Sequence, residues 1–265
     1  MRRERAGAGG DGVVLEGKVA LVTGSSKGIG RAIAVALARA GADVGVNYNT
    51  DPAGAEATCA AIGEAGREAV AVQADVSDRA AAERLIGTVA ARFGRVDVLV
   101  NNAALLSGHR GSFVDWPPEL WQRVMAVNLD GPVHCTQFAL RTMLERGEGG
   151  RIINISSARA ILVGPKATAY VAAKAALTKL SQALAVEFGP HGITVNVIAA
   201  GAVLTPGMQA GPDGQARWIA RSPVGRMGLP EDIAGAAVYL ASPAASYVNG
   251  QILSVDGGYV VNGTT

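Results

Sequence analysis

Short runs of β-branched and other apolar residues alternate with longer Ala-rich stretches along this chain, and this alternation limits the folds open to it. Repeated β-α units of this kind form a parallel sheet covered by helices on both faces. Each run is short and nearly continuously apolar, which is typical of a strand buried on both faces. We expect seven strands, at residues 19–22, 44–47, 69–73, 98–100, 151–155, 194–198 and 251–255.

The Ala-rich stretches between these runs carry apolar residues at helical spacing. The clearest is 169–188, where Ala173, Leu177 and Leu184 recur along one face and Gly189-Pro190 ends the helix. Further helices are predicted at residues 29–40, 51–65, 79–93, 119–145 and 231–241. With 265 residues and no interdomain linker, the chain is expected to form a single α/β domain.

Two segments fall outside this pattern. Residues 1–16 begin with a Gly-rich stretch that contains Arg2, Arg3 and Arg5 and lacks the apolar core of a secretory signal. We therefore expect a disordered leader, followed by a domain at residues 17–265. Residues 202–229 have no firm assignment and are too long for an ordinary connection, so we predict a lid over a binding site, with Trp218 as a candidate substrate contact.

Composition argues against several classes of partner. The formal net charge is +2, from 24 basic and 22 acidic residues, and 5% of residues are aromatic, so we expect no nucleic-acid partner. No apolar run approaches the roughly 20 residues that cross a membrane. Cys59 and Cys135 form no disulfide framework, which favours a cytoplasmic setting. Because His109, His134 and His191 are isolated, no metal site is predicted.

A glycine-rich turn joins the first strand to the first helix, with the sequence Thr23-Gly24-Ser25-Ser26-Lys27-Gly28-Ile29-Gly30. Glycines there let the backbone approach a pyrophosphate, and the helix N-terminus supplies N–H donors and partial positive charge. The spacing Gly-x3-Gly-x-Gly differs from the common Gly-x-Gly-x2-Gly fingerprint, so a simple tight turn is the alternative. The position after the first strand favours a dinucleotide-binding loop.

Tyr170 and Lys174 are four residues apart on the predicted helix 169–188, so their side chains share one face. A tyrosine that acts as an acid or base near neutrality needs its pKa lowered by about three units, or roughly 4 kcal/mol, and a nearby ammonium group supplies much of that. Such a pair often occurs by chance. Ser157, thirteen residues before Tyr170 and just past a strand, adds a hydroxyl that can donate to the same substrate oxygen.

Together these residues resemble the compact, single-domain branch of the short-chain dehydrogenase/reductase family, which includes 3-oxoacyl thioester reductases. The resemblance extends from Gly17 to Gly258. It rests on Thr23 to Gly30, Asp75-Val76, Asn101-Asn102-Ala103-Ala104, Asn128, Ile155-Ser156-Ser157, Tyr170 with Lys174, Gly201 with Thr205, and Asp256-Gly257-Gly258. It implies a Rossmann-type, doubly wound parallel sheet of about seven strands, with the cofactor where the strand order reverses.

The resemblance also implies roles for individual residues. Tyr170 would be the general acid in reduction and Ser157 would polarise the carbonyl. Lys174 would hold the ribose hydroxyls and lower the pKa of Tyr170, and Asn128 would position a water in a proton relay. The full set of cofactor contacts would be Gly24, Ser26, Lys27, Gly28, Ile29, Gly30, Asn47, Asp75, Val76, Asn102, Ala103, Tyr170, Lys174, Gly201, Val203 and Thr205. Ala104 and Ala200 depart from the family, which usually has glycine and proline there.

The choice between the two nicotinamide dinucleotides depends on the end of the second strand, where a carboxylate would bind the free ribose 2′-hydroxyl. That stretch, 46–50, contains no acid before Asp51, and Lys27 in the glycine loop is placed to meet a 2′-phosphate. We therefore favour NADP(H), with NAD(H) as the alternative.

The predicted function is an oxidoreductase that interconverts a ketone and a secondary alcohol. A 3-oxoacyl thioester reductase, a metabolite ketoreductase and a sugar dehydrogenase all fit, and Arg110, Arg159, Lys166, Arg217 and Arg221 would suit an anionic or carrier-bound substrate. The alternative class is a catalytically silent nucleotide-binding regulator or scaffold. Such a protein has no need for the full set of Ser157, Tyr170, Lys174 and Asn128, and all four are present. The resemblance implies a homotetramer or homodimer formed through residues 119–145 and 169–188.

Overall fold

A parallel sheet forms the centre of the molecule in the computed structural model, which describes residues 13–106, 112–163, 167–206, 208 and 211–262. The strand order among these residues is β3-β2-β1-β4-β5-β6-β7. The strands are β1 Val19–Val22, β2 Asp43–Tyr48, β3 Ala69–Gln73, β4 Val98–Asn101, β5 Gly150–Ser157, β6 Ile193–Ala200 and β7 Ile252–Val255. This is the predicted doubly wound, Rossmann-type sheet, because β1 pairs with both β2 and β4 and the order reverses between β1 and β4.

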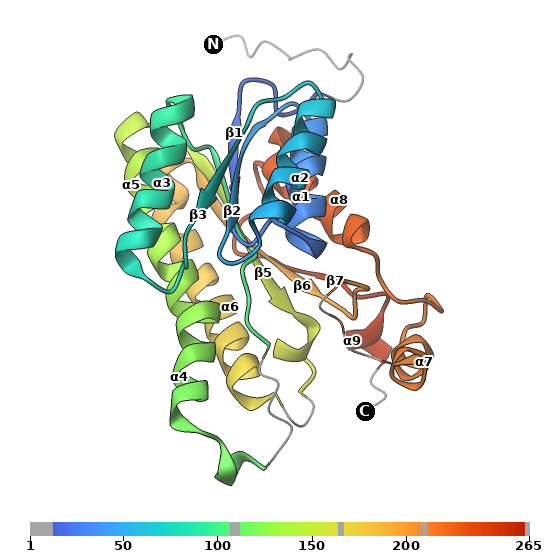
Figure 1. Ribbon diagram of the computed structural model, residues 1–265. Helices are drawn as coiled ribbons and strands as arrows, with labels where there is room; N and C mark the ends of the chain where they lie inside the picture. Colours follow the sequence, from blue (N-terminus) through green and yellow to red (C-terminus); the bar gives the residue numbers. More distant parts are fainter. Residues whose placement is uncertain (1–12, 107–111, 164–166, 207, 209–210, 263–265) are drawn as a thin grey trace.

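Helices cover both faces of the sheet. They are α1 Gly28–Arg39, α2 Pro52–Glu64, α3 Arg79–Phe93, α4 Pro118–Met125, α5 Gly131–Arg146, α6 Thr168–Phe188, α7 Pro212–Arg221, α8 Pro230–Ala241 and α9 Tyr259–Asn262. Figure 1 shows α1, α2 and α8 on one side of the sheet and α3, α5 and α6 on the other. None of the described helices is both long and apolar enough to span a bilayer.

Two apolar layers hold the helices to the sheet. On one face Ile33 of α1 and Ile233 of α8 are fully buried with the side chains of the central strands. On the other face Leu85 of α3 and Met143 of α5 are fully buried as well. Burial of each such side chain contributes about 1.5–3 kcal/mol, so these layers fix the strand ends on which the site is built.

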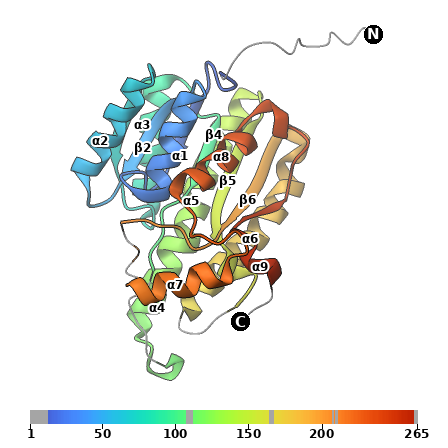
Figure 2. The same ribbon diagram turned by 90° about the vertical axis from the view of Figure 1, so that its right-hand side faces the viewer.

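Most predicted elements are confirmed, and two helical segments differ. The predicted helix 119–145 is interrupted at Ala126–Asp130 by a π-helical turn, η2, which separates α4 from α5. The predicted lid, 202–229, contains the helix α7, which the sequence pattern did not reveal. Figure 2 shows α7 and α9 at the same end of the molecule as α4, beyond the sheet.

Two further expectations need correction. The outer strands are not buried on both faces, and Ile252 and Leu253 of β7 are each 37% exposed, because an edge strand has a neighbouring strand on one side only. The expected leader also overlaps the fold at its end. Leu15 is 1% exposed and its N–H donates to the Ala40 carbonyl at 2.7 Å, so the packed chain begins before Gly17.

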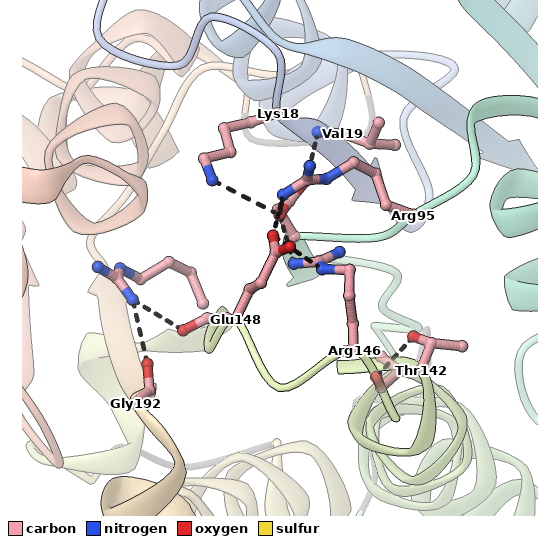
Figure 3. A network of polar contacts seen from close by, with 11 residues as sticks. Lys18, Val19, Arg95, Thr142, Arg146, Glu148 and Gly192 are labelled. Carbon is pink, nitrogen blue, oxygen red and sulfur yellow. Dashed lines mark hydrogen bonds and ion pairs between the residues drawn. The ribbon is translucent and has the colours of Figure 1, made fainter. Parts of the chain in front are cut away.

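Asp97 lies at the amino edge of the sheet, immediately before β4, and pairs with several basic side chains. Figure 3 shows three of them, Lys18, Arg95 and Arg146, directed toward one another. Its carboxylate accepts hydrogen bonds from the Val19 N–H at 2.9 Å, from Arg95 at 2.6 and 2.7 Å, and from Arg146 at 2.7 Å. Burial opposes ionisation, but Arg95, the Val19 N–H and Arg146 together hold the pKa of Asp97 below its usual value. The network ties β1, β4 and the end of α5 together, opposite the edge described next.

Candidate active site

The glycine loop after β1 packs directly against the segment after β4, at the point where the strand order reverses. The Thr23 hydroxyl accepts the N–H groups of Asn102 at 2.9 Å and Ala103 at 3.0 Å. A Cβ on Gly24 would lie 2.9 Å from the Ala103 Cα, so only glycine permits this approach. The Asn102 amide nitrogen donates to the carbonyls of Thr23 and Gly24 at 2.8 and 3.0 Å. Asn102, the expected ribose contact, therefore uses its nitrogen to hold the loop.

The N-terminus of α1 emerges from this loop with its N–H groups uncapped by any described side chain. Lys27 is the N-cap residue and its own side chain makes no capping hydrogen bond. Gly28 has a φ of 57°, a left-handed conformation that favours glycine. A Cβ on Gly30 would collide with the Asn102 amide nitrogen and the Gly24 carbonyl. The arrangement leaves donors and partial positive charge for an anion.

Asn47, an expected cofactor contact, supports the loop from below instead. It is 1% exposed, and its side-chain oxygen accepts the Gly24 N–H at 3.0 Å. Its amide nitrogen donates to the carbonyls of Ala74 at 3.1 Å and Val72 at 3.3 Å. Its side chain is thus engaged by the protein, and direct contact of Asn47 with a cofactor stays a prediction.

At the end of β3, Asp75 is held by neighbouring side chains. It accepts hydrogen bonds from the Ser77 hydroxyl and from Arg123 of α4, each at 2.6 Å. Although burial opposes this, Ser77 and Arg123 hold the pKa of Asp75 below its usual value. Val76 is 4% exposed and packs on Gly131, where a Cβ would lie 2.7 Å away. These contacts tie α4 and α5 to the carboxyl edge where a nucleotide base is expected.

Ser157 and Tyr170 lie in hydrogen-bond contact at the carboxyl end of β5. Ser157 is the last residue of β5 and Tyr170 lies in the first turn of α6. The adjacent Ser156 is directed elsewhere, and its hydroxyl contacts the Lys174 carbonyl and the Thr178 hydroxyl, each at 3.2 Å. Of the two neighbouring serines, only Ser157 thus has its hydroxyl against the phenol, as the thirteen-residue spacing predicted.

Lys174 lies beneath this pair and is 1% exposed. Its Nζ donates to the Ile155 carbonyl at 2.8 Å and lies 5.8 Å from the centroid of the Tyr170 ring. Burial lowers the pKa of Lys174 from 10.5 to about 8. Burial also raises the pKa of Tyr170, and the Ser157 hydrogen bond and the Arg159 charge oppose this only in part. Desolvation is thus the larger effect on the pKa of Tyr170, and the lowering expected from Lys174 stays a prediction.

Asn128 lies on the π-helical turn η2 and is fully buried. Its amide nitrogen donates to the carbonyls of Leu105 and Val124, each at 2.9 Å, and its oxygen accepts the Leu105 N–H at 3.3 Å. The side chain therefore anchors the segment after β4. Its expected contact with a relay water stays a prediction.

The chain after β6 closes the far side of the site. A Cβ on Gly28 would lie 3.4 Å from the Thr205 side chain, so Thr205 faces the start of α1 across a narrow gap. Gly201 lies so close to Asp256 that a Cβ would approach its Cα to 2.6 Å. Val203 is 7% exposed and pairs with Gly228. Of the basic residues expected at the mouth, Arg110 and Lys166 lie outside the described residues.

Comparison of this chain with known proteins shows which family it belongs to. A family described as Enoyl-(Acyl carrier protein) reductase matches residues 24–260. A short-chain type dehydrogenase/reductase from Mycobacterium marinum has a similar structure, with a TM-score of 0.88, 35% identity, and coverage of 94% of this chain and 98% of that chain. The chain is a short-chain dehydrogenase/reductase.

Two curated relatives of this dehydrogenase/reductase act on sugar-like compounds by name. L-rhamnose 1-dehydrogenase (NAD(P)(+)) of Sphingomonas sp. (strain SKA58) is 41% identical over 252 residues, which is 94% of this chain and 98% of that protein. The 2-dehydro-3-deoxy-D-gluconate 5-dehydrogenase of Dickeya dadantii (strain 3937) is 39% identical over 250 residues, with coverage of 93% and 96%. The chain is an oxidoreductase that interconverts a ketone and an alcohol with a nicotinamide cofactor.

The residues at the carboxyl edge fit that cofactor. The uncapped N-terminus of α1 supplies donors for a pyrophosphate, and Gly24 and Gly30 keep its approach clear of side chains. Thr205 faces this loop from the chain after β6. Gly24, Ser26, Lys27, Gly28, Ile29, Gly30, Ala103 and Thr205 would hold it, with Lys174 and Tyr170 beside the reactive end.

Several supporting residues were missed by sequence reasoning. Ser25 is fully buried, and its hydroxyl donates to the Val22 carbonyl at 2.8 Å and accepts the Asn47 N–H at 3.1 Å. Arg31 donates to the carbonyls of Ser26 and Gly54 and so fixes the loop to α2. Only the Asp51-Pro52 pair, a helix-start signal, pointed to the junction with α2.

A cavity of about 140 Å³ lies beside the carboxyl ends of β6 and β7. Trp218 of α7 lines it and packs on Tyr259 of α9, with ring centroids 5.5 Å apart. Ser157, Tyr170 and Lys174 do not line this cavity. Trp218, the suspected substrate contact, thus joins α7 to α9 here, and substrate contact stays a prediction.

Proposed function

We propose that Tyr170 transfers the proton in the interconversion of ketone and alcohol, and that Ser157 holds the reacting oxygen. In reduction the phenol donates its proton to the carbonyl oxygen while the Ser157 hydroxyl donates a hydrogen bond to the same oxygen. The nicotinamide, when bound, supplies the hydride in reduction and accepts it in oxidation. The phenolate then recovers a proton from solvent, so each turnover begins from the neutral phenol.

The hydrogen bond between Ser157 and Tyr170 carries this proposal. It brings two hydroxyls to one point at the carboxyl edge, above a buried lysine and on the edge that carries the glycine loop. Lys174 keeps this arrangement rigid through the Ile155 carbonyl and contributes a positive charge near the phenol at neutral pH. We assign Asn128 the role of holding the segment after β4 in place.

The neighbouring serines provide a matched test of this proposal. Ser157→Ala should lower kcat/KM about 100-fold or more, because the substrate oxygen loses a donor in the transition state. Ser156→Ala should retain turnover, since that hydroxyl contacts only Lys174 and Thr178 in its surroundings. Nicotinamide absorbance with a panel of ketones and alcohols would measure both variants. Equal losses in the two variants would contradict the assignment of Ser157.

We further propose a preference for NADP(H), on the charges around the end of β2. Asn49 and Thr50, which follow β2, are exposed and neutral, and Lys27 is exposed at the start of α1. The Gly54 N–H, the Ser26 hydroxyl and the nearby charges of Lys27 and Arg31 hold the pKa of Asp51 below its usual value. The Asp51 carboxylate offsets part of the positive charge of Lys27. We therefore expect the enzyme to accept NAD(H) as well, with lower preference than NADP(H).

Two opposed variants would measure this preference. Lys27→Gln should lower the ratio of kcat/KM for NADPH over NADH about tenfold, because a charged contact to a phosphate is lost. Asp51→Asn should raise the same ratio. Lys179→Gln, on the exposed side of α6, serves as the control. An unchanged ratio in Lys27→Gln would remove the basis of the NADP(H) proposal.

We also propose that the enzyme is a homodimer or homotetramer formed through α4, α5 and α6. Leu144 of α5 and Val186 of α6 are 38% and 80% exposed, and a second copy would cover such side chains. Light scattering should give a mass that is two or four times the 26.9 kDa of one chain. A mass of one chain at micromolar concentration would contradict this proposal.

A further inference from the structure

A row of polar contacts joins β5 to one face of α6. Three successive residues of β5 each meet a polar residue of the helix, and the pairs are Asn154 with Ser181, the Ile155 carbonyl with Lys174, and Ser156 with Thr178. Tyr170 lies one turn before Lys174 on the same face of α6, and Ser157 is the next residue of β5. The Nζ of Lys174 lies 5.8 Å from the centroid of the Tyr170 ring. The two hydroxyls that we assign to the reaction thus stand at the end of this polar row.

The contact at the other end of the polar row is fully enclosed, because Asn154 is 1% exposed and Ser181 is fully buried. The Asn154 amide nitrogen donates to the Ser181 hydroxyl at 2.8 Å, and this hydroxyl donates to the Leu177 carbonyl at 2.7 Å. The Asn154 amide oxygen accepts from the Asn101 amide nitrogen of β4 at 2.8 Å. Asn101 donates in turn to the Thr136 hydroxyl of α5 at 3.0 Å. Asn154 therefore joins α6 to β4 and, through Asn101, to α5.

This geometry limits where α6 can stand along β5. The apolar contacts beneath the helix are not directional. A hydrogen bond is directional, and a buried amide that loses its partner is strongly unfavourable. A shift of α6 by one residue, about 1.5 Å, would separate Asn154 from Ser181 and leave the amide nitrogen unpaired. Since a continuous helix moves as a unit, the same shift would carry Tyr170, about 16 Å along the axis from Ser181, away from Ser157.

The neighbouring side chain in the row, Ser156, has a substitute. Its hydroxyl contacts the Lys174 carbonyl at 3.2 Å, and the Thr178 hydroxyl donates to the same carbonyl at 2.8 Å. Loss of the Ser156 hydroxyl therefore leaves this carbonyl bound, in agreement with the turnover expected for Ser156→Ala. Asn154 has no substitute of this kind. Among the described residues, its amide nitrogen is the one group that donates to the Ser181 hydroxyl.

We propose that Asn154 is a positioning residue for the reaction, and that its hydrogen bond to Ser181 sets the place of α6 along β5. The inference rests on the proposed roles of Ser157 and Tyr170. The buried amide acts by keeping the phenol beside the Ser157 hydroxyl, so that both oxygens meet the substrate oxygen together. A misplacement of less than about 1 Å between reacting groups slows the chemical step, while the glycine loop that would hold the cofactor stays in place.

Two buried asparagines on neighbouring strands provide the test. Asn154→Leu keeps the approximate size of the side chain and removes its hydrogen bonds. Asn196→Leu on β6 is the matched control, because Asn196 is also 1% exposed and its amide binds two main-chain groups just before β7 rather than α6. The assay is ketone reduction with NADPH at a temperature where both variants are folded. Asn154→Leu should lower kcat at least tenfold, with the KM for ketone and the Kd for NADPH within about threefold of wild type. Asn196→Leu should keep kcat within about threefold.

Two further variants separate the contact from general packing. Ser181→Ala breaks the contact from the side of the helix and leaves the hydrogen bond between Asn101 and Asn154 in place. It should also lower kcat about tenfold, without change in KM or in the Kd for NADPH. Asn154→Asp is the conservative variant, because its side chain keeps an acceptor for Asn101 and a partner for the Ser181 hydroxyl. It should recover kcat to within about threefold of wild type. Should Asn154→Leu fail to fold, Ser181→Ala decides the question.

The outcomes separate this proposal from its foundation. A wild-type kcat in Ser181→Ala, equal losses of kcat in Asn154→Leu and Asn196→Leu, or a loss that lies wholly in NADPH binding would overturn the positioning role of Asn154. Retained turnover in Tyr170→Phe would instead overturn the proposed function itself.

Discussion

The Nζ of Lys174 donates to the main-chain carbonyl of Ile155 at 2.8 Å, two residues before Ser157 on the same strand. A buried ammonium group thus connects α6 to the end of β5, where the two proposed reacting hydroxyls meet. The interaction explains how a single lysine is both a structural tie and an electrostatic component of the site. It also makes the stability of the enzyme depend on the protonation of Lys174.

The free energy of unfolding of the enzyme, measured relative to a variant with a neutral residue at position 174, should rise as the pH becomes alkaline. The pKa of Lys174 is about 8 in the folded chain against 10.5 as the reference value, so between these values the unfolded chain holds a proton that the folded chain has lost. Stability therefore rises with pH across this window. Relative to Lys174→Met, the free energy of unfolding of the wild-type enzyme should rise by about 2 kcal/mol between pH 7 and pH 9.5.

Urea unfolding of both proteins at the two pH values would measure this difference. Groups that titrate equally in the two proteins cancel in the comparison. A difference that stays constant with pH would mean that Lys174 is not desolvated as the structure indicates.

Asp97 should contribute to stability but not to chemistry. Its removal leaves Arg95 and Arg146 without their partly buried partner, which costs about 3 kcal/mol at neutral pH. Because the pKa of Asp97 is held below 3.8 in the folded chain, this contribution is complete above about pH 5 and is lost as the pH falls below about 4.

Thermal unfolding of Asp97→Ala, with Glu83→Ala on the exposed side of α3 as control, would test this expectation. The variant should keep its kcat at a temperature where it is folded, since Asp97 lies at the opposite edge of the sheet from Tyr170. A stability loss that persists unchanged at pH 3 would contradict the assigned ionisation.

Gly30 should not tolerate even one added methyl group. In Gly30→Ala the Cβ would meet the Asn102 amide nitrogen and the Gly24 carbonyl, so the glycine loop must move. We expect the Kd for NADPH to rise at least tenfold, together with a lower Tm. Gly63→Ala is the matched helical control, because its Cβ would meet nothing within 4 Å. That change should stabilise α2 by about 0.5–1 kcal/mol. Equal NADPH affinity in the two variants would contradict the packing of the loop.

Local sequence patterns were enough to place the strands and the glycine loop. Strands β1 and β3 and helix α3 begin and end where their residues predicted. The exposure of β7 could not be read from its apolar residues, because strand order is a property of the whole sheet. The π-helical turn at Ala126–Asp130 was also not predicted, because the sequence pattern indicated one continuous helix over residues 119–145.

The sequence predicted the outline of the site but not the structural hydrogen bonds of two of its asparagines. Asn47 and Asn102 follow the expected motif, but their amide nitrogens hold backbone carbonyls of the protein. A sequence does not distinguish an asparagine that supports a loop from one that faces a ligand. The upward shift of the pKa of Tyr170 could not be predicted, because it comes from burial of the phenol, which spacing along a helix does not report.

Proton transfer by Tyr170 is tested most directly by Tyr170→Phe, which removes one oxygen atom and leaves the ring in place. Tyr239→Phe, at an exposed position on α8, is the matched control. The measurement is the rate of ketone reduction at saturating NADPH, with NADPH binding followed separately by fluorescence. We predict that Tyr170→Phe binds NADPH with a Kd within about threefold of the wild-type value while kcat falls at least 1,000-fold, or about 4 kcal/mol. Turnover by Tyr170→Phe at the rate of Tyr239→Phe would contradict the account.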